Sequence, residues 1–301
     1  STNCYFSIYL FGWETLVMLD SKYDGIFQYP QIVQDYWKNE PNYLIEYDEC
    51  CDSKDYCAIY FCSNDIWFPH TEEIFRKRIV QKNFFEWYHC RIEKAYKHIF
   101  VRDIFKQWYL TGINGQINSP QKMLEFLKQE TDGFKVITIG SSAGGYASAL
   151  FGPKLKAEKS ICFNGQFCLE RLVNESSLTI SPLLFSIFKK NNREAVNILN
   201  DIDSDTPIYY IYSDRSRWDV EQHEYTKGVQ NVKCIEFNSS KHGIPFLKVA
   251  LPKFINLEVD QLDELTRKVQ QPLLFTIKFV GIYKTISGFV SQVYKAYKKR
   301  H

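Results

Sequence analysis

The sequence predicts an α/β protein in which helices cover both faces of a mostly parallel sheet. Short runs rich in β-branched and aromatic residues alternate with segments whose apolar residues recur at helical spacing. The stretch "VITIGSSAGGYASALFG", residues 136–152, contains both patterns, because an apolar run ends in glycine and a helical pattern follows at once. Strands that alternate with helices pair in parallel, and a parallel sheet needs cover on both faces.

In the first half of the chain the strongest strand signal is "YCAIYFCSND", residues 56–65, which ends in a polar turn. The segment 71–89 has apolar residues at helical spacing and predicts a helix. A second helix over 119–130 has Ser119 as its N-cap and Pro120 at its first helical position. We also expect strands over 14–19, 42–48, 97–103 and 134–140, and a helix over 29–39.

The second half continues the alternation, starting with a helix near Ser142. Residues 168–205 are polar-rich with Pro182 inside, and we expect them to form a helical lid insertion. A helix over 219–228 ends at a glycine, and further strands are expected over 159–167, 206–214 and 231–238. The simplest division is one catalytic domain over residues 1–256, lid included, with a C-terminal helical appendage over residues 257–301.

The composition indicates a soluble globular protein with a sizeable core. Of 301 residues, 45% are hydrophobic and 24% are charged. The net charge of +2 gives no reason to expect a nucleic-acid partner. No run of about 18 or more uncharged apolar residues occurs, so no membrane-spanning helix is expected. The first twenty residues lack a basic start and contain Glu14, which is not typical of a signal peptide.

The nine cysteines are scattered, and several lie inside apolar strand-like runs, as is typical of reduced thiols in a cytoplasmic protein. The cluster Cys50, Cys51, Cys57 and Cys62 contains no CxxC pair and no histidine at ligand spacing, so no metal site is expected. The glycines after residue 139 match neither the dinucleotide fingerprint nor the P-loop. We therefore expect no cofactor.

Residues 140–144, Gly-Ser-Ser-Ala-Gly, match the G-x-S-x-G pattern of a nucleophile elbow. The turn is strained at its serine, and the residues two before and two after it must be small because they approach closely. Only Ser142 has glycine at both of these positions, since Ser141 has Ile139 and Ala143. Ser142 also lies at a helix N-terminus, where free N–H groups favour negative charge. The alternative is a plain strand-to-helix turn rich in serine and glycine.

A serine presented in this way needs a histidine base that follows it in the chain. His242 comes directly after the last expected strand, in "FNSSKHGIP", where the carboxyl edge of the sheet should lie. His223 falls within the helix 219–228, and His301 is the last residue. His242 is therefore the expected base. A loop histidine without a catalytic role is the alternative.

Two aspartates could orient this histidine, because both follow the strand 206–214 in "SDRSRWDVEQ". Asp214 comes immediately after the strand and would lie close to the sheet edge. Asp219 lies further along, and with Gln222 it also resembles a capping box that begins the next helix. We favour Asp219, because an acid in a loop beyond the strand reaches the histidine more easily.

An oxyanion hole needs two N–H donors. The backbone of Ala143 should supply one, since it follows the candidate nucleophile. The other should come from the loop after an earlier strand, and "FCSNDIWFP" offers Ser63 or Asn64. An Asx-turn after the strand is the alternative role for these two side chains.

The segments "IYFCSND", "HIFVRD", "VITIGSSAGG", "IYYIYSDRSRWD" and "SSKHG", in this order, resemble the α/β-hydrolase superfamily over about residues 55–255. The elbow "GSSAGG" is similar to those of bacterial serine esterases and capsule-polysaccharide O-acetyltransferases of that fold. The resemblance implies a Ser142–His242 pair with Asp219 or Asp214, a covalent acyl-enzyme, and an ester substrate that is a small molecule or an acylated bacterial glycan. An acyl-CoA donor would fit the transferase branch.

A catalytically inactive relative that serves as a binding or scaffold protein is the competing interpretation. The intact pair Ser142 and His242 argues against it. The aromatic residues, including those of "WYLTGIN", residues 108–114, would suit sugar stacking, although aromatic side chains more often belong to the core.

The tail, residues 272–301, has the pattern of a basic amphipathic helix. No acidic residue follows Glu264. Gly281 and Gly288 weaken the helix by about 1 kcal/mol each. The pattern is typical of a helix on an anionic membrane surface, and packing on the main domain or on a second subunit is the alternative. The apolar stripe consists of Phe275, Phe279, Ile282, Ile286, Phe289, Val293 and Tyr297, and the cations are Lys278, Lys284, Lys295, Lys298, Lys299 and Arg300.

Overall fold

A computed structural model describes residues 29–174, 196–202 and 204–298 of the chain. Its centre is a seven-stranded sheet in the order β1-β3-β2-β4-β5-β6-β7, in which every neighbouring pair is parallel except β1 and β3. The predicted fold class is therefore confirmed. The expected strand 14–19 and residues 175–195 of the expected lid lie outside the described residues. The strands are β1 (Tyr43–Tyr47), β2 (Tyr56–Phe61), β3 (Lys97–Val101), β4 (Lys135–Ser141), β5 (Lys159–Phe163), β6 (Ile208–Ser213) and β7 (Val232–Phe237).

The inner strands are buried on both sides, which explains why they read as continuous apolar runs rather than as alternating patterns. Every residue of β3, β5 and β6 is buried. One apolar layer includes Ile137 of β4 and Ile211 of β6, and the opposite layer includes Val136 and Tyr210 of the same strands. Neighbouring residues of one strand thus point into different layers, and both layers need helices.

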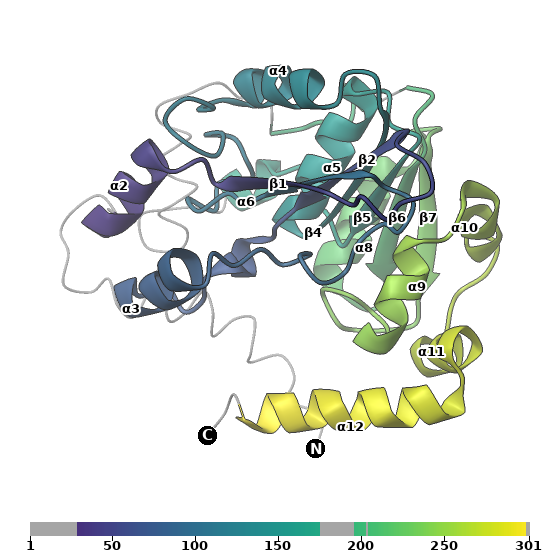
Figure 1. Cartoon of the computed structure of the whole chain (residues 1–301). Helices are drawn as coiled ribbons and strands as arrows, with labels where there is room; N and C mark the ends of the chain where they lie inside the picture. The colour runs from purple at the N-terminus through teal and green to yellow at the C-terminus, as the bar shows by residue number, and fades with distance from the viewer. Residues whose placement is uncertain (1–28, 175–195, 203, 299–301) are drawn as a thin grey trace.

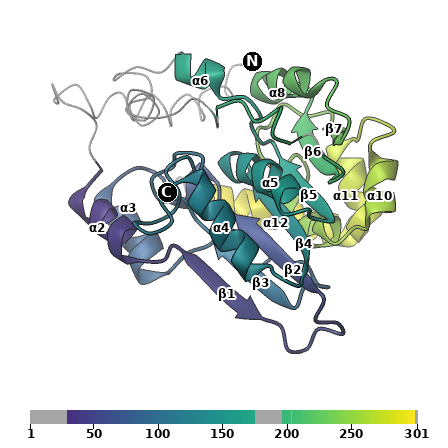
Figure 2. The same ribbon diagram turned by 90° about the horizontal axis from the view of Figure 1, so that it is seen from above.

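Helices cover the two faces of the sheet (Figure 1). In that view α4 and α5 lie above the sheet, and α3, α9 and α11 lie below it; Figure 2 shows the same layers from above. Met123 and Leu127 of α4 belong to the upper core, while Phe75 of α3 and Phe254 of α9 belong to the lower one. The described helices are α2 (Gln31–Asn39), α3 (Glu72–Phe75), α4 (Pro120–Glu130), α5 (Ala143–Lys154), α6 (Glu170–Asn174), α8 (Arg217–Thr226), α9 (Leu251–Ile255), α10 (Val259–Leu265), α11 (Pro272–Val280) and α12 (Ile282–Lys298), with the 3₁₀ turns η1 (Asn64–Ile66) and η3 (Lys248–Ala250) and the π-helical turn η2 (Arg76–Gln81).

The helix expected over 71–89 is shorter than predicted. It begins at α3, widens into the π-helical turn η2, and ends at Gln81. Asn83 then adopts a positive φ of 43°, which ends any helix. The aromatic residues that follow reach the core from an irregular segment, where the indole Nε1 of Trp87 donates to the carbonyl of Phe61 at 3.1 Å.

The tail forms two helices rather than one continuous stripe. Gly281, with a φ of 83°, separates α11 from α12. Phe275 of α11 is buried in the lower core, whereas the apolar residues of α12 are exposed. Segment 257–270 is integrated with the sheet, because Gln270 pairs with Phe237 of β7. Among the described residues, no helix is long and apolar enough to cross a membrane.

Candidate active site

The predicted elbow connects β4 to α5. Ser142 stands between the two elements with φ 52° and ψ −119°, a conformation that non-glycine residues rarely adopt. Two backbone hydrogen bonds hold it there: its N–H donates to Phe163 O at 2.8 Å, and its carbonyl accepts from Tyr146 N at 3.0 Å. Strain of this kind persists only where the surroundings fix it, and it concentrates at functional sites.

The glycines of the elbow are required by close backbone contacts. A Cβ on Gly140 would lie 2.0 Å from the carbonyl oxygen of Gly144, and a Cβ on Gly144 would lie 2.2 Å from that of Phe61. A Cβ on Gly145 would lie 2.8 Å from the Cα of Gly165. The turn therefore packs directly against the end of β2 and the chain that follows β5, and Ser142 lies at the carboxyl edge of the sheet.

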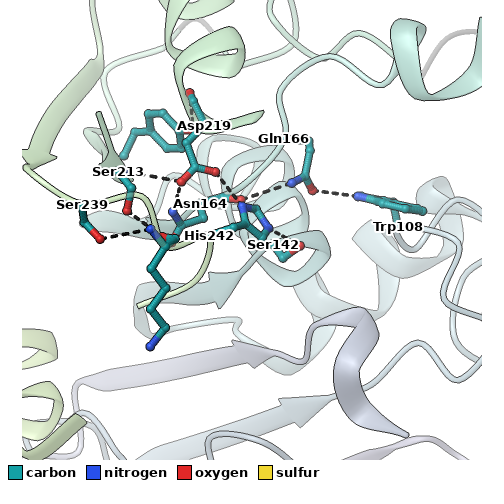
Figure 3. Close-up of polar contacts among 10 residues, drawn as sticks. Trp108, Ser142, Asn164, Gln166, Ser213, Asp219, Ser239 and His242 are labelled. Carbon is teal, nitrogen blue, oxygen red and sulfur yellow. Dashed lines mark hydrogen bonds and ion pairs between the residues drawn. The ribbon is translucent and has the colours of Figure 1, made fainter. Parts of the chain in front are cut away.

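Three predicted side chains meet at this edge (Figure 3). The Nε2 atom of His242 lies 3.3 Å from the Oγ atom of Ser142. The Nδ1 atom of the same ring lies 2.6 Å from Oδ1 of Asp219. When Nδ1 carries the proton and donates to the carboxylate, Nε2 is left to accept the hydroxyl proton of the serine. The arrangement is thus a hydrogen-bonded chain from acid to base to hydroxyl.

Asp219 is nearly fully buried, at 1% exposed, and its second oxygen is also paired. Oδ2 accepts hydrogen bonds from Asn164 Nδ2 and, at 3.3 Å, from Ser213 N. The residue lies in the first turn of α8 rather than in a loop before it, and Ser216 occupies the N-cap position. The capping-box alternative therefore does not apply, and the carboxylate faces His242 instead.

Asp214 does not contact His242. Its Oδ1 accepts from Ser239 N at 3.0 Å, and it lies 3.7 Å from the guanidinium of Arg215. This bond links the end of β6 to the loop that carries His242. His223, the other described histidine that follows Ser142, lies on α8 and contacts Cys234 Sγ at 3.3 Å.

The two alternatives for the second oxyanion donor have different surroundings. The N–H of Ser63 donates to Glu86 Oε2 at 2.5 Å and its hydroxyl donates to Oε1 at 2.7 Å, so this N–H is already occupied. Burial raises the pKa of Glu86 above its usual range. Among the described residues, no acceptor is hydrogen-bonded to the N–H of Asn64 or to that of Ala143. These two donors stay available, and the assignment of Ser63 does not fit.

Sequence reasoning missed a polar chain behind the acid. Asn164 follows β5 directly, adopts a positive φ of 48°, and donates to Asp219. Gln166 donates to the carbonyl of Asn164 at 3.2 Å and accepts from the indole of Trp108 at 2.9 Å (Figure 3). The sequence could have indicated Asn164 and Gln166 by their position directly after a predicted parallel strand, because such residues lie at the same edge of the sheet as Ser142.

The aromatic residues of the segment 108–114 belong to the core rather than to a sugar-stacking surface. Trp108 is 4% exposed and Tyr109 is 1% exposed. Among the described residues, the ring of Trp218 borders the site: it is 40% exposed and lies edge-on to His242, with 6.1 Å between the ring centroids. Next to Trp218 a small cavity of about 30 Å³ is lined by residues of α6 and α8.

Over the described ranges, no group of three or more histidine, cysteine or acidic side chains could hold a metal ion.

No family model matches the chain, and no curated protein matches it. Similar solved structures include a protein with unknown function from Staphylococcus aureus subsp. aureus Mu50, which is 12% identical, with 74% of this chain and 94% of that chain covered and a TM-score of 0.49. The capsule O-acetyltransferase of Neisseria meningitidis serogroup A is 12% identical (65% and 83% covered, TM-score 0.44). The S-formylglutathione hydrolase from Staphylococcus aureus is 10% identical (63% and 78% covered, TM-score 0.41).

At these identities and TM-scores, the similar structures transfer no activity to this chain. The fold assignment depends on the chain's own arrangement. A serine elbow follows the central strand β4, an acid follows β6 and a histidine follows β7, in the order that this architecture uses. The chain has the α/β-hydrolase fold.

Proposed function

We propose that the protein is a serine-dependent acyl-ester hydrolase or acyltransferase that works through Ser142, His242 and Asp219. The single observation that carries the proposal is the continuous hydrogen-bonded chain Asp219–His242–Ser142 on a strained elbow. A structural serine needs neither a positive φ nor a histidine that a buried carboxylate orients. Nucleophile, base and orienting group within hydrogen-bond reach are the signature of covalent acyl transfer.

In the first step, His242 Nε2 takes the proton of Ser142 Oγ as that oxygen attacks the carbonyl carbon of an ester or thioester. A bond forms between Oγ and the carbon, and the carbonyl electron pair moves onto oxygen. The free N–H groups of Ala143 and Asn64 are the candidates to hold this oxyanion. The carbon–oxygen or carbon–sulfur bond then breaks, and the leaving group takes the proton from His242.

In the second step, an acceptor hydroxyl attacks the acyl carbon, and His242 removes its proton. The bond between this carbon and Oγ of Ser142 then breaks, and Oγ takes the proton from His242. Water as the acceptor makes the protein a hydrolase, and a sugar hydroxyl makes it an O-acyltransferase. The exposed ring of Trp218 beside His242 is the surface on which an acceptor would stack. An acylated glycan and an acyl-CoA donor are the substrates that fit this transferase branch.

A donor and acceptor screen tests the proposal. Purified protein is incubated with p-nitrophenyl esters, acetyl-CoA or acylated sugars, with and without free sugar acceptors, beside the Ser142→Ala variant. We expect release of p-nitrophenol or free CoA from at least one donor, and none above background from the variant. Equal release by both proteins from every active donor would contradict the proposal and favour the inactive, scaffold interpretation.

A further inference from the structure

Helix α12 presents apolar side chains to the solvent. It has 17 residues, which corresponds to a length of about 25 Å. Figure 1 shows it along the bottom of the molecule, beyond α11. Its exposed apolar side chains fall on one side when residues are spaced by 100°. We call this set the outward face; each member is more than half exposed, and the members are Ile282, Tyr283, Ile286, Phe289, Val290, Val293, Tyr294 and Tyr297.

The opposite side of α12 packs on the protein through small and polar residues. Thr285 is 2% exposed, and its hydroxyl donates to Gly281 O at 2.7 Å. Gly288 approaches the side chain of Val249 in η3 so closely that a Cβ would lie 2.8 Å from it. The helix is thus oriented with its apolar side away from the core, which is the reverse of what a helix covering its own domain requires.

Neither α12 nor the segment on which it packs contains an acidic residue. No acidic residue occurs between residues 238 and 257 or after Glu264. Between these segments, Glu258 pairs with Lys94, Asp263 pairs with Lys233 and Glu264 pairs with Arg267. The cations of the two segments are Lys241, Lys248, Lys253, Arg267, Lys268, Lys278, Lys284, Lys295, Lys298, Lys299 and Arg300.

The tail is also attached to the loop that carries His242. The N–H of Leu247 donates to Thr276 Oγ1 of α11 at 3.3 Å, and the Nζ of Lys253 donates to Phe279 O at 2.9 Å. The rings of Phe246 and Phe275 pack with their centroids 5.0 Å apart. The helix that precedes α12 is therefore in contact with the segment that follows His242.

We propose that the outward face of α12 lies on the surface of an anionic lipid bilayer. Apolar burial at the interface and attraction of the basic segments to anionic headgroups act together in such a helix. The positive charge of α12 favours an anionic bilayer over a second copy of the chain as the partner of the outward face. A two-fold contact through that face would bring two positively charged helices together. An amphipathic helix of this kind lies in the interface plane, with its apolar side turned toward the acyl chains.

Vesicle co-sedimentation tests the proposal with the full chain. Phosphatidylcholine vesicles with phosphatidylglycerol should bind the protein at low salt, and phosphatidylcholine alone should bind it much less. High salt should weaken the binding, since it screens the headgroup charge. The Ser142→Ala variant should bind like the wild type, so that failure of this proposal and failure of the proposed function are distinguishable.

Matched variants of α12 test which side of the helix binds the vesicles. Ile286→Gln with Val293→Gln removes apolar surface from the outward face and should weaken vesicle binding roughly tenfold or more. Ser287→Gln with Ser291→Gln places the same new residues on a different, exposed side of α12 and should bind like the wild type. Lys284→Gln with Lys295→Gln should weaken binding to anionic vesicles only. Melting temperature and ester hydrolysis in solution check that all three variants are folded.

Two results would overturn the proposal. One is the absence of binding to anionic vesicles at low salt. The other is a stable dimer in analytical ultracentrifugation that does not bind vesicles and that dissociates in the outward-face variant. This result would assign the outward face to a second copy of the chain.

Discussion

Ser142 combines a strained backbone with a side chain that is free to react. Its positive φ carries a cost of about 1–3 kcal/mol that the surrounding structure must offset. The hydrogen bonds of its N–H and carbonyl fix the turn without using Oγ. The hydroxyl is thus left to His242, and the neighbouring Ser141 belongs to β4.

Ser142→Ala should abolish turnover of an activated ester, by a factor of about 10⁴ or more, because the covalent step has no other nucleophile. Ser141→Ala, one residue away, is the matched control and should retain turnover. Both variants should unfold at nearly the wild-type urea concentration. Activity of Ser142→Ala within about tenfold of the wild type would exclude Ser142 as the nucleophile.

The two aspartates should differ in the same assay. Asp219→Asn preserves the shape of the site but removes the negative charge that holds His242 in the reactive tautomer, so kcat should fall by about 10⁴. Asp214→Asn should leave kcat close to wild type, since Asp214 contacts Ser239 and Arg215 rather than the histidine. A larger loss of kcat in Asp214→Asn than in Asp219→Asn would show that Asp214 orients His242.

At the scale of elements, the site is where three strands end. β4 delivers Ser142, β6 leads into α8 with Asp219, and β7 leads into the loop with His242. Because these strands are parallel, their carboxyl ends share one edge, and residues 23 to 100 positions apart meet there. The tight junction of β4 with α5 is what keeps the first of these residues in place.

The junction predicts a stability effect. Gly144→Ala would place a Cβ 2.2 Å from the carbonyl oxygen of Phe61, so the backbone must shift, and we expect a loss of about 2 kcal/mol or more in the free energy of unfolding. Gly133→Ala is the control: unlike Gly144, Gly133 has a φ of 80° that is unfavourable for alanine, but nothing lies within 4 Å of its Cβ. Urea titration should rank Gly144→Ala as the less stable variant, and the reverse order would contradict the close contact.

At the scale of the whole molecule, stability should depend on pH through buried histidines. His98 of β3 is 1% exposed, and its Nδ1 contacts Tyr60 OH at 2.9 Å. Burial, with the charge of Arg91, lowers its pKa from 6.5 to about 4. Between these values the unfolded chain binds a proton that the native state does not bind, so stability is lost as pH falls from 6.5 to 4.

The variant His98→Phe should remove this dependence, because a phenyl ring fits the stack with Tyr60 and Phe100 but does not titrate. Between pH 7 and pH 5, its free energy of unfolding should fall by about 2 kcal/mol less than that of the wild type. Urea titrations of both proteins at the two pH values measure the difference. Equal losses would show that His98 is not held neutral.

Most of the fold could be predicted because its strands are short, apolar and bounded by turns. β4, expected at 134–140, forms at Lys135–Ser141, and β6, expected within 206–214, forms at Ile208–Ser213. The prediction of a helix over 71–89 was wrong for the second half of that segment. Apolar spacing does not reveal that Trp87 reaches the core from an irregular segment, where its indole finds a backbone acceptor.

The candidate site was accessible to sequence reasoning where a local rule applied. The glycine spacing identifies Ser142 as the candidate nucleophile. The position of His242 directly after the last strand identifies it as the candidate base. Asn164 and Glu86 were missed, since their roles depend on contacts with Asp219 and Ser63, which lie 55 and 23 residues away. Such pairs follow from strand order and register, and no local pattern carries them.

Labelling with a fluorophosphonate probe tests the central claim most directly, because the probe forms a covalent bond only with an activated serine. Intact-mass and peptide analysis of the wild type should show one adduct, on Ser142. The adduct should persist in Ser141→Ala, be absent from Ser142→Ala, and form much more slowly in His242→Ala. No adduct on the folded wild type, or an adduct on another residue, would contradict the proposed site.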